Sequence, residues 1–144
     1  MNDVEIKSKI SDFISKQKLT VIATVDQANN KPESACIAFA ERENLELIFG
    51  TSNLSRKYQN LQKNPHVSFV IGWDPTIGTV QYEGIAQEVP LEQKDAYAQI
   101  MIAKNPRSEK FMKREDQRYF LVKPTWIRIL DMSVQPDVTH EITL

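Results

Sequence analysis

The segment LTVIATVDQANNKPESACIAFA, residues 19–40, decides the fold. Its first part alternates between two sets of small or β-branched side chains, and this period of two predicts a strand over residues 19–25. The polar stretch 26–31 predicts a turn, and Pro32 opens a second strand that runs to Ala40. Two strands joined by so short a turn form an antiparallel hairpin.

The second strand carries no charged residue between Ser34 and Ala40, and most of its side chains are small. This composition predicts that both of its faces are covered and that another group packs close to its backbone. A turn over residues 41–44 and a third strand over 45–51 follow. Successive hairpins of this kind predict an antiparallel meander rather than βαβ units.

The rest of the chain alternates between helical and strand patterns. Apolar spacing predicts helices over 3–17 and 55–63, a third from Pro90 to the break at Asn105-Pro106, and a short helical piece over 108–113. Further strands are predicted over 67–73, 79–89 and 118–130, with an edge or bulge at Pro124, and a last short strand in 132–144. Because closure removes exposed strand edges, we expect a mainly β (α+β) fold, an antiparallel barrel of about six strands flanked by helices, as a single domain over 1–144.

The composition excludes several classes of protein. The chain has 144 residues and a formal net charge of −1, which argues against a protein that coats nucleic acid or an anionic membrane. A single cysteine, Cys36, and two histidines offer no internal disulfide and no metal site. The four glycines form no dinucleotide or Walker motif. Asp3 and Glu5 argue against a signal peptide, so we expect a soluble, cytoplasmic protein.

The segment FGTSNLSRK, residues 49–57, is where the sequence points to chemistry. A strand ends in hydroxyl residues, and a helix begins with two cations, Arg56 and Lys57, at the end of the helix dipole that disfavours positive charge. A bound anion reverses that preference. The free N–H groups of the first turn, the hydroxyls of Thr51, Ser52 and Ser55, and both cations could converge on one phosphate.

Simpler interpretations stand beside this one. Arg56 and Lys57 could be a solvated pair, because charge pairs are common on surfaces. Cys36, in a strand among alanines, is more often a small core residue than a redox thiol. No nucleophile–base pair and no acid–base pair of carboxylates is visible, so the catalytic residues are unknown. Their absence is compatible with a flavin enzyme, in which the cofactor carries the hydride chemistry.

The pattern extends beyond the phosphate segment. Residues 51–57 are followed, in order, by Asn60-Leu61, Asn64-Pro65-His66-Val67, Trp73 and Tyr82-Glu83-Gly84-Ile85-Ala86. This series resembles the pyridoxamine 5'-phosphate oxidase-like proteins, which are FMN-binding split β-barrels, and the resemblance runs from about Leu19 to Val89. It implies a homodimer with FMN at the interface between two barrels, and a small-molecule substrate rather than nucleic acid or membrane.

The resemblance also assigns individual positions. It implies that Arg56 and Lys57 hold the FMN phosphate and that Thr51 contacts the phosphate region. The backbone of Ala35, Cys36 and Ile37 would lie along the isoalloxazine ring, and Thr79 would lie near the polar edge of the ring.

Two departures narrow the resemblance. True pyridoxamine phosphate oxidases carry basic residues at both ends of the flavin-binding part of the second strand, and residues 34–40 have none. Their C-terminal Trp, His and Arg have no match in spacing here, where Trp126, Arg128 and then Asp131 stand. The chain therefore resembles the short general-stress or uncharacterised flavin-binding members, without support for a vitamin B6 substrate.

Three functions follow as hypotheses. The first is an FMN-dependent oxidoreductase that exchanges hydride or electrons with a small organic or nicotinamide substrate. The second is a non-catalytic module that binds flavin or a deazaflavin. The third is a haem-binding relative, for which His66 and His140 are the axial ligands on offer.

Overall fold

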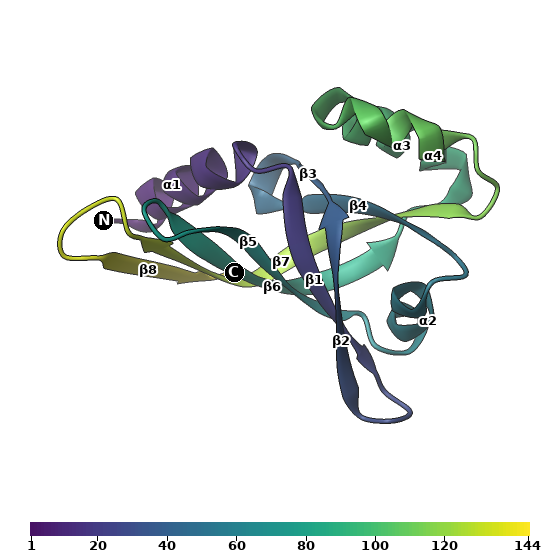
Figure 1. The fold of residues 1–144 in the computed structure, drawn as a ribbon, viewed down its shortest axis with the longest axis horizontal. Coiled ribbons are helices and arrows are strands. Elements are labelled where there is room, and N and C mark those ends of the chain that lie inside the picture. The colour runs from purple at the N-terminus through teal and green to yellow at the C-terminus, as the bar shows by residue number, and fades with distance from the viewer.

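The computed structural model describes residues 1–144 and gathers every strand into one antiparallel sheet (Figure 1). The strands are β1 (Leu19–Asp26), β2 (Lys31–Ala38), β3 (Ala40–Glu41), β4 (Leu47–Ser52), β5 (His66–Asp74), β6 (Gly78–Glu88), β7 (Gln117–Asp131) and β8 (Val138–Thr143). The helices are α1 (Asp3–Ser15), α2 (Arg56–Lys63), α3 (Lys94–Lys104) and α4 (Glu109–Met112), with short 3₁₀ turns at Glu43–Leu45, Leu91–Gln93 and Pro106–Ser108. No helix combines the length and the apolar character that crossing a membrane requires.

The chain itself joins the two ends of the sheet. The strand order is β2-β1-β5-β6-β7-β4-β3, with β8 also paired to β7. β2 and β3 therefore stand at opposite ends of this order, although only Phe39 separates them in sequence. Phe39 is fully buried, and its N–H donates to the carbonyl of Lys18 at 3.3 Å. The sheet must curl to bring its ends together at this residue, which confirms the expected barrel flanked by helices.

The second predicted strand differs from the expectation in two ways. It divides at the fully buried Phe39 into β2, which pairs with β1, and β3, which pairs with β4. This division and the C-terminal strand β8 raise the number of strand segments to eight. β2 pairs only with β1, and its outward side chains, Cys36 among them, are exposed. Within one chain, then, Cys36 is not a core residue, and the second face of β2 is not covered.

Aromatic side chains fill the interior of the curled sheet. Phe49 stacks on Phe120 with ring centroids 5.1 Å apart, and Phe69 meets Tyr82 edge to face. The Tyr82 hydroxyl donates to the carbonyl of Leu45 at 2.7 Å, which satisfies the one polar atom that this buried ring carries. These contacts make the barrel interior a packed core rather than a ligand cavity.

The long strand β7 changes partners at Pro124. One side of β7 pairs with β6 along most of its length, and the register shifts beside Pro124. The other side pairs first with β4, through residues 117–122, and then with β8, through residues 126–131. Proline has no N–H for a strand partner, so it fits the gap between β4 and β8. This arrangement confirms the bulge predicted there.

The N-terminal helix α1 lies over the end of the sheet that holds β8 (Figure 1). Its predicted stripe of Ile6, Ile10 and Ile14 is buried. An ion pair of 2.6 Å between Lys9 Nζ and Asp131 Oδ2 fastens the helix to the end of β7. This bond and those from Ser133 lower the pKa of the Asp131 carboxyl to about 2.

The Lys9–Asp131 pair predicts a pH-dependent loss of stability in an Asp131→Asn variant. A carboxyl with a pKa below its unfolded value of about 3.9 stabilises the fold fully above that value and loses the effect as the pH falls through about 2. Near neutral pH the variant should unfold at a lower temperature than the wild type, and the difference should close as the pH falls toward 2. Asp12→Asn, which removes an exposed partner of Lys16, is the control in the same thermal scans.

Candidate functional site

Three of the predicted phosphate ligands meet where β4 runs into α2. Ser55 caps the helix, since its Oγ accepts from the N–H of Tyr58 at 3.1 Å. The hydroxyls of Thr51 and Ser55 lie 2.8 Å apart, and Lys57 Nζ donates to Thr51 Oγ1 at 3.4 Å. We call Thr51, Ser55, Arg56 and Lys57 the cradle.

The ammonium of Lys57 is the unbalanced charge of the cradle. It is half-buried, and no carboxylate lies within ion-pair distance. Burial disfavours its charged form and so lowers the pKa of Lys57 below its ordinary value. A cation partly shielded from water, with only a long bond to Thr51, is an incomplete arrangement, and an anion would complete it.

Arg56 lies on the other side of the cradle and has a partner. Its exposed guanidinium reaches back to Glu33 on β2, with Nη1 2.9 Å from Oε2. A cavity of about 120 Å³ opens between β1, β2 and α2, and it includes Ala35 and both cations; its lining residues are Ile22, Thr24, Glu33, Ser34, Ala35, Arg56 and Lys57. Ala35 therefore lines the same cavity as Arg56 and Lys57.

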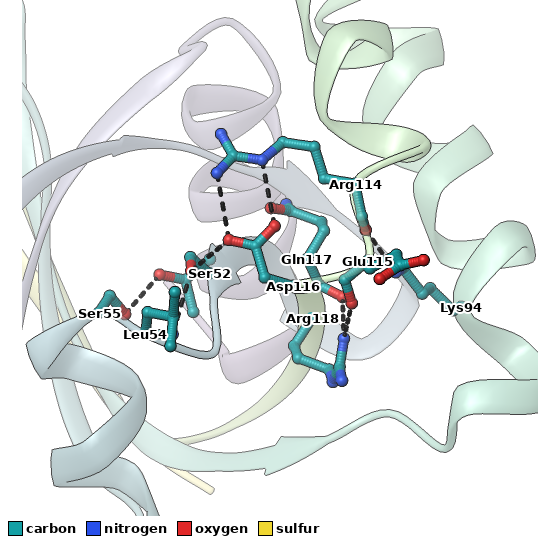
Figure 2. A network of polar contacts seen from close by, with 10 residues as sticks. Ser52, Leu54, Ser55, Lys94, Arg114, Glu115, Asp116, Gln117 and Arg118 are labelled. Carbon is teal, nitrogen blue, oxygen red and sulfur yellow. Dashed lines mark hydrogen bonds and ion pairs between the residues drawn. The ribbon is translucent and has the colours of Figure 1, made fainter.

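Ser52 points toward Asp116 (Figure 2). Its Oγ donates to Asp116 Oδ2 at 2.7 Å and accepts from the N–H of Leu54 at 3.0 Å. Arg114 holds the same carboxylate through Nε and Nη2, at 3.2 and 3.1 Å. Ser52 thus braces the turn before α2 against the loop before β7 (Figure 2), and it positions the cradle rather than contributing its hydroxyl to it.

Cys36 and Ile37 line a second pocket, of about 250 Å³, between the free edge of β2 and the helices α3 and α4. Its lining has no charged residue: Cys36, Ile37, Ala38, Gly50, Met101, Ser108, Phe111, Gln117 and Tyr119. Gly50 on β4 keeps this pocket in shape, because a Cβ there would stand 2.4 Å from Gln117 Nε2 and 2.9 Å from the Tyr119 ring. We call it the uncharged pocket.

Two strand edges border this region without strand partners. β2 pairs with β1 alone, and β4 pairs with β3 only at its first two residues, so the stretch from Phe49 to Ser52 has strand bonds on one side. Free backbone N–H and C=O groups therefore lie beside both pockets, where a planar polar ligand can pair with them.

Thr79 lies elsewhere in the chain. It stands at the start of β6, pairs with Leu130, and donates its hydroxyl to the carbonyl of Gly72. It lines neither the cavity at Arg56 nor the uncharged pocket. Any contact of Thr79 with a ligand in the cradle would have to come from a second copy of the chain.

The structure adds site residues that the sequence patterns did not single out. The cavity at Arg56 and Lys57, called the cradle cavity below, has Glu33 on its wall, and Asn60 hydrogen-bonds both Glu33 and Thr24 of β1. Asp116 holds the turn before α2 through Ser52. Asn60 is part of the sequence series that resembles the flavin-binding family, and this was a usable signal. Glu33 and Asp116 are single carboxylates among many, and only the tertiary structure connects them to the cradle.

Comparison with known proteins decides the family. A family model described as pyridoxamine 5'-phosphate oxidase matches residues 6–131. The chain belongs to this family. Pyridoxine/pyridoxamine 5'-phosphate oxidase of Haemophilus influenzae is 32% identical over 102 residues, which cover 63% of this chain and 48% of that protein. The chain spans about half the length of the curated relatives it matches.

Solved structures share the fold over most of the chain. General stress protein 26 of Bacillus anthracis superposes with a TM-score of 0.74 at 22% identity, covering 97% of this chain and 99% of that one. The haem storage protein of Vibrio cholerae superposes with a TM-score of 0.66 at 21% identity, covering 82% and 89%. At this level of identity the likeness shows the split-barrel fold alone.

The brace at Ser52 predicts that Asp116→Ala loosens the turn before α2. Without the carboxylate, Ser52 Oγ loses a charge-assisted hydrogen bond and is no longer held in place to accept the hydrogen bond from the Leu54 N–H. Hydrogen exchange at the amides of residues 53–55 should quicken about tenfold relative to the wild type. The neighbouring variant Glu115→Ala, whose exposed side chain makes no bond in the network, should leave this exchange unchanged; equal exchange in both variants would contradict the brace.

Proposed function

We propose that this protein is an FMN-binding flavoprotein that acts as an oxidoreductase on a small organic or nicotinamide substrate. The observation that carries the proposal is the half-buried ammonium of Lys57, without a carboxylate partner, beside Thr51 and Ser55 at the start of α2. The resemblance described above implies FMN as the ligand, and the terminal phosphate of FMN would match both the charge of Lys57 and the hydroxyl donors of the cradle.

The surroundings of the cradle fit the rest of the cofactor. The free edge of β2 at Ala35–Ile37 offers backbone groups for the polar edge of the isoalloxazine ring, and the uncharged pocket offers an apolar wall. Bound FMN would supply hydride or electron transfer. The chain would hold the phosphate at Arg56 and Lys57, fix the ring against β2, and exclude water with the side chains of α3 and α4.

The uncharged pocket also bears on the substrate. Its polar groups are a few neutral ones, such as those of Ser108, Gln117 and Tyr119, with no cation to meet a second phosphate. A phosphorylated vitamin B6 substrate would leave its charge without a partner there. We therefore propose a neutral organic molecule, or the nicotinamide ring of a reduced nucleotide, as the reactant beside the flavin.

A homodimer is part of the proposal. One row of outward side chains crosses the sheet through Cys36, Val21 and Val70 and then continues through Gln81 and Arg128. The first three are uncharged and lie on β2, β1 and β5, and the polar half begins at β6. The exposed side chains of Val70 and Cys36 would be covered by a second copy, which would also bring its own Thr79 toward the cradle.

The phosphate cradle predicts that Arg56→Gln and Lys57→Gln each weaken FMN binding about 10- to 100-fold, because each removes a charge-assisted bond to the phosphate. Quenching of flavin fluorescence measures the affinity. Riboflavin, which lacks the phosphate, should bind the wild type and both variants equally. Lys63→Gln, at the other end of α2, is the control.

The same titration separates the rival functions. Absence of FMN binding at micromolar concentration, or an equal loss of riboflavin binding in the variants, would contradict the cradle. Tight FMN binding without reduction by a reduced nicotinamide would support a binding module instead of an enzyme. A Soret band after haem addition, without flavin binding, would support the haem-binding alternative, although His66 and His140 lie outside the cradle cavity and the uncharged pocket.

The uncharged part of this row, formed by Cys36, Val21 and Val70, predicts that Val70→Glu prevents dimerisation. A carboxylate at this position would be desolvated in the interface, at a cost that a small dimer does not tolerate. Sedimentation should show a monomer, and FMN affinity should fall with it, since the site is completed by the partner. Gln81→Glu is the control. It places the same charge on β6, in the polar part of the row, and should leave the dimer intact. If both variants remain dimers, the interface lies elsewhere.

A further inference from the structure

The cradle cavity holds a carboxylate as well as two cations. Glu33 lies on its wall with Arg56 and Lys57, and the Glu33 side chain is only 10% exposed. A negative charge inside an anion-binding cavity opposes the ligand that the cavity is proposed to take.

Glu33 is fixed rather than free to swing away. Its Oε1 accepts from Asn60 Nδ2 at 2.9 Å, and the same amide donates to Thr24 Oγ1 at 2.9 Å. Asn60 is buried. The other oxygen, Oε2, lies 2.9 Å from Arg56 Nη1 and 3.7 Å from Lys31 Nζ. One oxygen thus anchors the carboxylate to α2 and β1, and the other one engages the cradle's exposed cation.

This geometry makes Glu33 a competitor for Arg56. A phosphate between Arg56 and Lys57 would stand beside the Glu33 carboxylate, and like charges repel strongly where water is partly excluded. Free phosphate must overcome this repulsion with the cradle contacts alone. The phosphate of FMN arrives with a flavin ring and ribityl chain, whose contacts along β2 and β4 can offset it.

We propose that Glu33 sets a threshold for anion binding: it holds Arg56 and lowers the affinity of the cradle for any phosphate group. Inorganic phosphate then stays out, whereas a phosphate attached to a flavin, which makes further contacts, still binds. The inference rests on the proposed function for the identity of the flavin. The exclusion of free phosphate by the fixed Glu33 carboxylate depends on the cavity alone and not on the identity of the flavin. A purely structural Glu33 would need only its bond to Asn60.

The variant Glu33→Gln separates the two roles, because it removes the charge and keeps the side-chain length and an oxygen for Asn60. We expect it to bind FMN about tenfold more tightly than the wild type, with riboflavin affinity unchanged. Inorganic phosphate should compete with FMN in the variant at concentrations that leave the wild type unaffected. Glu43→Gln, which removes an exposed partner of Arg42 and lines neither the cavity at Arg56 nor the uncharged pocket, is the control for the loss of one carboxylate.

The outcomes are distinguishable. FMN affinity that is equal or lower in Glu33→Gln, with riboflavin unchanged, overturns the inference and leaves the proposed function standing. If the wild type binds no flavin, the proposed function fails, and direct titration with inorganic phosphate, followed by phosphorus NMR, still decides the inference. It is supported if phosphate binds Glu33→Gln better than the wild type and overturned if it does not. Thermal unfolding checks the fold of the variant, and Glu33→Ala replaces it should it fail to fold.

Discussion

The closure of the sheet at Phe39 is the constraint on which the rest of the structure depends. β2 and β3 lie at opposite ends of the strand order, yet a single buried residue connects them. The chain cannot satisfy this connection with a flat sheet, so the sheet curls. β2 does not pair with β4. It stays paired with β1 up to Ala38, whereas β4 pairs with β7 through Ser52. The barrel is therefore split where its ends meet.

That split lies beside the proposed ligand site. It leaves backbone groups of β2 and β4 without strand partners, and it lies directly before the turn that starts α2. The cradle cations, at the start of α2, and the uncharged pocket, beside α3 and α4, lie at two places along the same free edge of β2. One topological feature thus borders both the proposed phosphate site and the pocket proposed for a flat ring, while aromatic packing fills the interior.

Three charged side chains set the electrostatics at the cradle: its own Lys57 and Arg56, and Glu33 beside them. Lys57 is half-buried and lacks a carboxylate, Arg56 is exposed and held by Glu33, and Glu33 is fixed by Asn60. One cation of the cradle, Lys57, is therefore without a carboxylate partner, and the other, Arg56, is paired with Glu33. Such an arrangement favours an anion that brings further contacts with it, and this is the property expected of a site for a phosphorylated cofactor rather than for phosphate itself.

Local patterns were sufficient for most of the elements. The period of two over residues 19–25, the buried stripe of α1 and the break at Asn105-Pro106 depend on neighbours in sequence, and the structure has each of them. The division at Phe39 could not be predicted, because the same apolar residue suits a continuous strand and a strand that changes sides. The bulge at Pro124 was predictable, because a missing N–H constrains any sheet.

The sequence by itself determined the antiparallel fold, the strand–turn–helix segment with its hydroxyls and cations, and the resemblance that names FMN as the expected ligand. Only the tertiary structure decided that Ser52 turns to Asp116, that Glu33 enters the cradle, and that Cys36 is exposed. The physical reason is the range of the interactions. Periodicity and capping act within a few residues, whereas these contacts join strands and loops that meet only once the sheet has curled.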